Sequence, residues 1–234
     1  RMPEFGRGWF TYGTVLRELG RHDESLTAFD KAIQFESDPH EAWFEKAQVL
    51  FDLQQFDAAA VAFGQVTTLR PGHFIATYSK GLSLSHLGKV EQALQVYDEA
   101  LKIKPQTALI WRDRAVLLAK LDRSGEAMRS FRKALALNPR LTDAWFGIGL
   151  LLAEQKKFDK ALKAFDKELV RTPDHLSALI NKGASLANIG NLREAESYLT
   201  QAIQRLVELD ATESITMRIA TDNLRHIYRM QHLN

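Results

Sequence analysis

Histidines are the side chains best suited to acid–base or metal chemistry near neutral pH, and in this sequence they are scattered. The chain contains His22, His40, His73, His86, His175, His226 and His232. No two of them are four residues apart, the spacing that places two imidazoles on one face of a helix as in a zinc site. We interpret them as structural surface histidines, and the sequence predicts no metal site.

Other catalytic arrangements are also missing from the sequence. It contains no P-loop, no G-x-G-x-x-G, no H-E-x-x-H and no G-x-S-x-G motif. The absence of cysteine excludes thiolate zinc sites, iron–sulfur clusters and cysteine nucleophiles. A lysine-rich run between residues 156 and 167 is interleaved with Asp159 and Asp166, which favours a solvated face over a phosphate-binding stripe. We therefore expect a protein that is not an enzyme and that needs no cofactor.

The composition is that of a globular protein. Of the 234 residues, 45% are hydrophobic and 26% are charged, and 31 basic against 29 acidic residues leave a net charge of +2. This balance does not indicate nucleic-acid binding. No apolar run approaches the roughly 20 residues that span a bilayer, and no charged-then-apolar leader opens the chain. We expect no nucleic-acid partner, no membrane span and a cytoplasmic location.

The tryptophans and prolines indicate how the chain is organised into the structural elements that must position any site. Trp9, Trp43, Trp111 and Trp145 are separated by 34 residues or a multiple of 34. Five of the six prolines share one phase of the same period, and only Pro39 lies two residues late. Two rare residue types that follow one period indicate an internal repeat of 34 residues.

Each 34-residue unit has the pattern of two helices. Taking the tryptophan as position 4, positions 4, 8 and 11 form one apolar stripe and positions 20, 24 and 27 form another. Positions 8 and 20 hold small residues and position 24 holds a large ring in most units, so two helices can approach closely. Gly20, Gly88 and Gly190 stand in the turn between them, where a positive φ is tolerated. The sequence predicts helix–turn–helix units that bury a continuous core only by stacking.

This pattern resembles the tetratricopeptide repeat family, because the unit length and the Trp, Gly, Ala, aromatic and Pro positions agree in register. The resemblance implies an all-α fold, a right-handed α-solenoid of six helix–turn–helix repeats over residues 6–209. The six units are expected at residues 6–39, 40–73, 74–107, 108–141, 142–175 and 176–209. Asp210 and Glu213 have the D-x-x-E spacing of a helix start, so residues 210–234 are expected to form a C-terminal capping helix. Pro3 in the phase of a repeat terminator leaves two interpretations open, a piece of a longer array and a native start at Met2.

The resemblance also implies that the first helix of each unit lines a concave groove that receives partners. The expected groove residues are mostly apolar from the third unit onward, with Arg112 placed to orient a carboxylate. The predicted partner-binding residues are Phe44, Tyr78, Leu82, Arg112, Val116, Phe146, Leu150, Ile180 and Asn181. The alternative is that these side chains pack between neighbouring first helices and are mostly buried.

Three functions remain open at this stage. The first is a non-catalytic adaptor or scaffold that binds a peptide or helix of a partner protein in the groove. The second is a self-assembling scaffold that forms homo-oligomers through the groove or the capping helix. The third is the targeting region of a larger enzyme.

Overall fold

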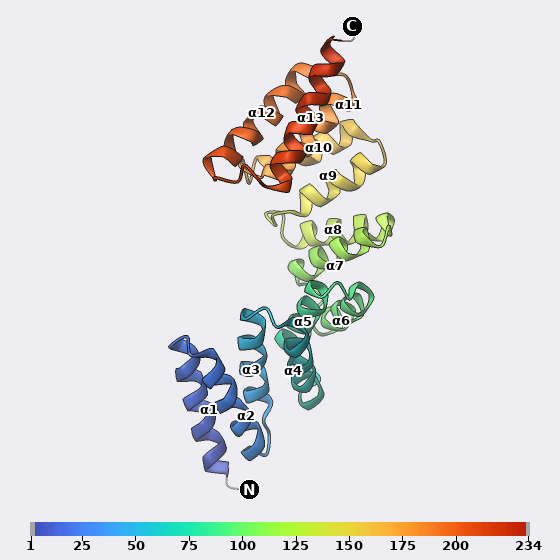
Figure 1. The fold of residues 1–234 in the computed structure, drawn as a ribbon. Helices are drawn as coiled ribbons and strands as arrows, with labels where there is room; N and C mark the ends of the chain where they lie inside the picture. Colours follow the sequence, from blue (N-terminus) through green and yellow to red (C-terminus); the bar gives the residue numbers. More distant parts are fainter. Residues whose placement is uncertain (1–2, 233–234) are drawn as a thin grey trace. The chain divides into compact units, whose positions relative to one another are not determined.

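The computed structural model describes residues 3–232, and all regular secondary structure within that range is α-helical (Figure 1). The helices are α1 (Pro3–Glu18), α2 (His22–Phe35), α3 (His40–Asp52), α4 (Phe56–Leu69), α5 (Phe74–His86), α6 (Val90–Ile103), α7 (Ala108–Lys120), α8 (Ser124–Leu137), α9 (Ala144–Glu154), α10 (Phe158–Leu169), α11 (Leu176–Asn188), α12 (Leu192–Glu208) and α13 (Ile215–His232). Among these helices, none is both long enough and apolar enough to cross a membrane. The expected all-α, solenoid-like repeat of helix pairs is confirmed.

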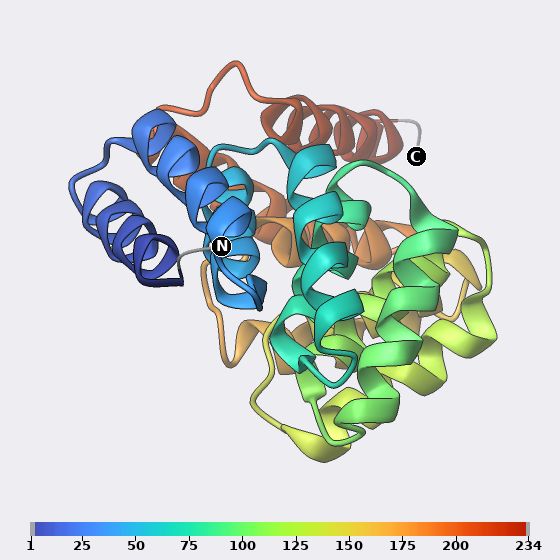
Figure 2. The same ribbon diagram turned by 90° about the horizontal axis from the view of Figure 1, so that it is seen from below.

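The helices fall into two compact units, and the boundary between the units lies within α7, after Ile110. In the N-terminal unit, α1 packs on α2, α3 on α4 and α5 on α6, and α2 also contacts α3 and α4 contacts α5. In the C-terminal unit, α9 packs on α10 and α11 on α12, and α13 closes the unit against α12 and α11. Figures 1 and 2 show α1 beside α2 and α13 beside α12.

The turn inside each helix pair repeats one backbone feature every 34 residues. The residue with a positive φ is in turn Gly20, Gln54, Gly88, Asp122, Lys156 and Gly190. The sequence predicted this conformation only where glycine stands. The other three turns adopt the same left-handed conformation with side chains that pay a steric cost for it.

Small residues on one helix admit a large ring from its partner, as the sequence predicted. A Cβ atom built on Gly149 would lie 2.3 Å from the ring of Phe165, and one on Gly81 would lie 2.5 Å from the ring of Tyr97. Both rings are at most 1% exposed. Glycine at these positions is therefore required by the close packing of α9 on α10 and of α5 on α6.

The last helix begins later than the sequence predicted. The first residue of α13 is Ile215, and the hydroxyl of Ser214 accepts a hydrogen bond from the backbone N–H of Met217 at 3.1 Å. Asp210, the expected cap, instead has a φ of 53° in the preceding turn. Ser214 therefore caps the helix, and Ala220 and Ile227 of α13 are buried in the core against α11 and α12.

Candidate functional site

A groove of about 700 Å³ lies in the C-terminal unit and brings together four of the predicted residues. Arg112 and Val116 of α7 and Phe146 and Leu150 of α9 line it. Val116 is 40% exposed, and the other three side chains are half-buried. Gly147 and Ala119 also line the groove, so its floor is apolar. The described residues thus leave an accessible apolar surface between two first helices.

The three predicted residues of the N-terminal unit have mainly packing contacts. The ring of Phe44 lies 5.0 Å from that of His73, and the ring of Tyr78 lies 5.9 Å from that of Tyr97. Phe44 lines a hollow of about 390 Å³, and Leu82 lines a separate hollow of about 170 Å³. These hollows are smaller than the groove of the C-terminal unit, and they lie in the other unit of the chain.

Ile180 and Asn181 do not line the groove, although the sequence placed both there. Ile180 is only 3% exposed and belongs to the core that α11 forms with α12 and α13. For Ile180, therefore, the expectation of an accessible side chain is wrong, because the terminal helices form a core around α11. The Asn181 amide donates to the backbone carbonyl of Ser177 at 2.8 Å, within its own helix.

A buried glutamate below the groove breaks the pattern of the repeats. Glu168 of α10 is 0% exposed. Its two carboxylate oxygens accept hydrogen bonds from the backbone N–H of Asp143 at 3.0 Å and of Phe146 at 3.2 Å. The equivalent residues of the other repeats are buried and apolar, namely Ala32, Val66, Ala100, Ala134 and Ala202. The carboxylate thus satisfies two N–H groups at the start of α9, where a negative charge is favoured.

The capped helix α9 begins out of phase with the other first helices. Helices α3, α5, α7 and α11 begin at His40, Phe74, Ala108 and Leu176, which predicts a start at residue 142, whereas α9 begins at Ala144. The residue before it, Asp143, has a φ of 65° and a ψ of −13°. A positive φ in a residue other than glycine is uncommon. At Asp143 it falls outside the 34-residue phase of the turns inside the helix pairs.

His175 connects Asp143 to the next helix pair. Its Nδ1 accepts from the backbone N–H of Ala178 at 3.1 Å and so caps α11, and its Nε2 lies 3.1 Å from Oδ1 of Asp143. Since Nδ1 accepts, the ring of the neutral histidine carries its proton on Nε2 and donates it to Asp143. The same ring lies 4.7 Å from that of Phe146. His175 and the similar cap His73 are thus structural, as expected, but half-buried rather than superficial.

Asp143, Glu168 and His175 come close enough to be considered as metal ligands, because their candidate ligand atoms lie within 4.8 Å of one another. The hydrogen bonds of these three residues argue against a metal site. The Nε2 atom of His175 bears the proton, and its Nδ1 is occupied by a backbone N–H. The oxygens of Glu168 face two N–H groups. The arrangement fits a helix cap better than a metal centre.

The charges at this end of the groove are unequal. The guanidinium of Arg112, expected to meet a partner's carboxylate, donates to Oδ1 of Asp113 at 2.9 and 2.8 Å. It lies 3.8 Å from Oδ2 of Asp143, whose side chain is 52% exposed. Among the residues that line the opposite end are Lys120 and Glu154. The carboxylates of Asp113 and Asp143 thus lie beside one guanidinium at the end where α7, α9 and α11 begin, and a third carboxylate, that of Glu168, bonds to the backbone of Asp143.

Sequence reasoning missed Asp143, Glu168 and His175 as a connected group. One signal was present, since Glu168 is a charged residue in a column of buried apolar residues. A charge at such a position needs hydrogen-bond partners, and the start of the neighbouring helix supplies them. No sequence feature predicted the backbone conformation of Asp143.

Comparisons with known proteins agree with this architecture. Sequence models of the tetratricopeptide repeat match residues 6–39, 44–108, 86–145, 143–167 and 176–205. No curated protein matches the chain significantly.

Solved structures with the same fold are numerous, at low sequence identity. MamA (residues 41 to the end) from Desulfovibrio magneticus RS-1 is 19% identical, with a TM-score of 0.69 over 75% of this chain and 99% of that one. YrrB, a tetratricopeptide repeat protein with an unusual peptide-binding site, is 23% identical. Its TM-score is 0.64, and the match covers 83% of this chain and 96% of YrrB. A tetratricopeptide repeat protein from Parabacteroides merdae ATCC 43184 is 13% identical. Its TM-score is 0.75, and the match covers 97% of this chain and 93% of that one.

At these identities the likeness concerns the fold. Taken with the matched repeat models and the helix pairs, it shows that the chain belongs to the tetratricopeptide repeat family, a family of protein–protein interaction modules.

Proposed function

We propose that this chain is a non-catalytic adaptor that holds a peptide or helix of a partner protein in the groove of its C-terminal unit. The observation that carries the proposal is the apolar groove of about 700 Å³ between α7 and α9. An accessible apolar surface with polar groups at its ends is typical of interaction sites. The peptide-binding site of YrrB, a protein of the same fold, supports the proposal.

The side chains of the floor favour a peptide over a flat protein surface. Phe146 and Leu150 lie one helical turn apart on α9, and Val116 faces the same groove from α7. Ala119 adds a small side chain between these larger groups, whereas the ring of Phe131 fills the space beside Gly147. A segment with apolar side chains about one turn apart matches this alternation of large and small residues.

The proposed extent of the repeats follows from the same helix pairs. We propose six repeats over residues 6–209, with the limits given above, and a capping helix within 210–234. The regular phase of the left-handed turn residues supports this division.

Selection from a library of random peptides displayed on phage tests the groove. The wild-type chain is expected to enrich a set of peptides, and Leu150→Glu is expected to lose them, because a charge would stand in the apolar floor. The matched control is Val170→Glu, since Val170 is 82% exposed and does not line the groove. Circular dichroism melting checks that each variant folds. Enrichment of the same peptides by the wild type and by folded Leu150→Glu would contradict the proposal, as would a selection that enriches nothing.

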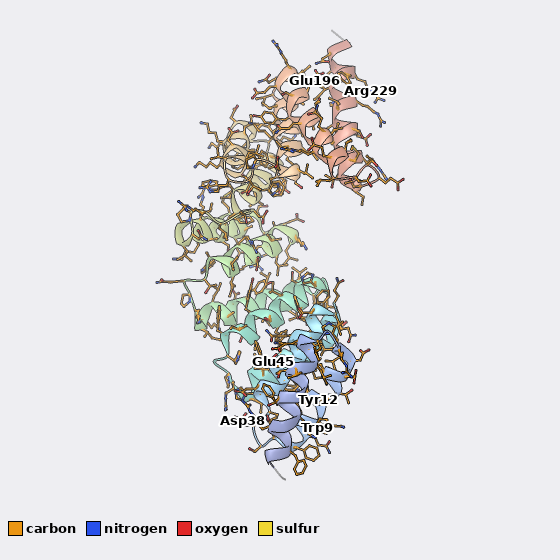
Figure 3. The ribbon with its side chains drawn as sticks, turned by 90° about the vertical axis from the view of Figure 1, so that its left-hand side faces the viewer. Trp9, Tyr12, Asp38, Glu45, Glu196 and Arg229 are labelled. Atoms are coloured by element: carbon orange, nitrogen blue, oxygen red, sulfur yellow. The ribbon has the colours of Figure 1, made fainter. Side chains whose placement is uncertain are left out.

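A second candidate function, self-association, is favoured by the outer face of α1. Phe5, Tyr12 and Val15 of α1, and Leu19 directly after its end, are between 46% and 65% exposed and continue one stripe at helical spacing. Figure 3 shows Tyr12 beside Trp9 on this helix. The residues of later repeats that correspond to Val15 are at most 2% exposed (Val49, Ser83, Leu117, Leu151 and Ser185).

At Val15 the α1 stripe thus exposes a position that helix pairs cover elsewhere in the chain, and a second copy could cover it here. Light scattering at increasing protein concentration measures the oligomeric state. The Leu19→Glu variant is expected to weaken any dimer, whereas a wild type that stays monomeric rules this candidate out.

A further inference from the structure

The conformation of Asp143 costs free energy that the other repeats avoid. A positive φ outside glycine is disfavoured, and the late start of α9 removes residues 142 and 143 from the helix. Buried Glu168 maintains this arrangement through its bonds to the N–H groups of Asp143 and Phe146. The result is a carboxylate at the end of the groove, on a fixed backbone and 52% exposed.

We propose that Asp143 binds a basic side chain of the peptide that occupies the groove. The ligand is thus an apolar segment with a lysine or arginine at one end. This inference rests on the proposed function, and it adds the class of residue that the partner must carry and the position in the groove where that residue binds.

The hydrogen bonds around Asp143 leave one oxygen available. Oδ1 lies 3.1 Å from Nε2 of His175. Oδ2 forms a long ion pair with the Arg112 guanidinium, 3.8 Å away, which is beyond hydrogen-bond distance. Within the described residues no side chain or backbone N–H hydrogen-bonds to Oδ2, so it can accept a charge-assisted bond from a partner's ammonium or guanidinium group.

The surrounding charges favour a cation over an anion at this place. Arg112 already forms two hydrogen bonds with Asp113. The carboxylates of Asp113, Asp143 and Glu168 outnumber the single guanidinium of Arg112. Electrostatic complementarity of this kind selects the partner and its orientation. An acidic group in the same place would meet two carboxylates of the groove wall.

The floor sets the order of groups in the ligand. Asp143 lies at the start of α9, Phe146 follows in the first turn, and Leu150 and Val116 lie farther along the groove. A peptide bound in this groove would therefore place its basic residue beside the ring of Phe146 and its apolar residues over Leu150 and Val116. The peptides selected on the wild type are expected to carry lysine or arginine next to an apolar pair.

Asp143→Asn is the informative variant, because asparagine has the same shape and tolerates the left-handed conformation well. It can also still accept the hydrogen bond from His175. The matched control is Asp122→Asn, which removes one charge from a residue that also has a positive φ, 56°, but does not line the groove. Both variants are expected to melt close to the wild type.

The measurement is the Kd of one selected peptide and of the same peptide with its basic residue replaced by methionine. We expect the wild type and Asp122→Asn to prefer the basic peptide by about tenfold, and Asp143→Asn to bind the two peptides equally. Equal binding by the wild type would overturn the inference, as would an unchanged preference in Asp143→Asn. If Leu150→Glu still enriches the same peptides, the proposed groove itself fails. Loss of binding in Leu150→Glu without any basic preference in the wild type leaves the groove intact and refutes the role of Asp143.

Discussion

The carboxylate of Glu168 on α10 accepts a hydrogen bond from the backbone N–H of Asp143 at 3.0 Å, at the edge of the groove. This contact links the two helices of one pair. It also explains why α9 starts at Ala144, because the same carboxylate bonds to Phe146 and so covers the first turn of the helix. The shape of this end of the groove therefore depends on a residue that no ligand can touch.

Replacing Glu168 by alanine, the residue most common at this position of the other repeats, tests that dependence. Glu168→Ala leaves two N–H groups without acceptors, and we expect a loss of about 1–3 kcal/mol in the free energy of unfolding. Urea unfolding followed by circular dichroism measures it. The control is Glu126→Ala, which removes only an exposed pair with Arg123 and is expected to cost much less. Equal effects of the two variants would show that the cap contributes nothing.

Substitutions at Asp143 separate backbone strain from side-chain bonding. Alanine lacks both the preference of aspartate for a positive φ and the bond to His175, so Asp143→Ala is expected to lose about 1–2 kcal/mol. Asp143→Gly relieves the strain and is expected to be more stable than Asp143→Ala. Thermal melting of the variants ranks them, and a glycine variant that melts below the alanine variant would refute the strain.

Two glycines of the C-terminal unit are expected to respond in opposite directions to alanine. A Cβ on Gly147 would lie 2.2 Å from the buried ring of Phe131, so we expect Gly147→Ala to destabilise by about 1–3 kcal/mol. A Cβ on Gly125 meets only the end of the Arg129 side chain, at 4.0 Å. Gly125→Ala is therefore expected to stabilise α8 by up to about 1 kcal/mol. Melting temperatures measure both changes, and a Gly147→Ala variant that melts at or above the wild type would contradict the packing of Phe131.

Glu45 in the N-terminal unit is expected to make stability depend on pH. Burial raises the pKa of Glu45, although its ion pair with Arg17 acts in the opposite direction. Figure 3 labels this side chain on α3. Because the folded state binds the proton more tightly than the unfolded state, Glu45 favours folding at low pH. This contribution is lost as the pH rises through the raised pKa.

The comparison variant is Glu45→Gln, which cannot titrate at this position. The free energy of unfolding of the wild type, minus that of the variant, is expected to be larger at about pH 4 than at about pH 7. Urea unfolding at the two pH values measures this difference. A larger difference at the higher pH would mean that the pair with Arg17 dominates over burial.

The sequence predicted the helix pairs because their pattern is local and repeated. The small residue at Gly149 and the ring at Phe165 recur in their columns, and they meet in the structure. The turn glycines Gly20, Gly88 and Gly190 were likewise found, because glycine marks a positive φ. Because the pattern repeats, recognising it in one helix pair supports the same prediction for the other pairs.

The sequence was less informative where a residue's role depends on a neighbouring element. Ile180 has the spacing of a groove residue, yet the core formed with α12 and α13 buries it. Arg112 was assigned to a partner, but the adjacent Asp113 engages it. The conformation of Asp143 depends on a hydrogen bond from a residue 25 positions away, and no local pattern encodes such a contact.

The deviation at Glu168 also bears on how such an array diversifies. Each helix pair contacts only its neighbours, and α11 already begins in the ordinary phase, at Leu176. The late start of α9 therefore changes only one helix pair. After duplication, copies of such a unit could acquire different ligand preferences one at a time, through single substitutions in a buried column, while the scaffold that carries them is inherited unchanged.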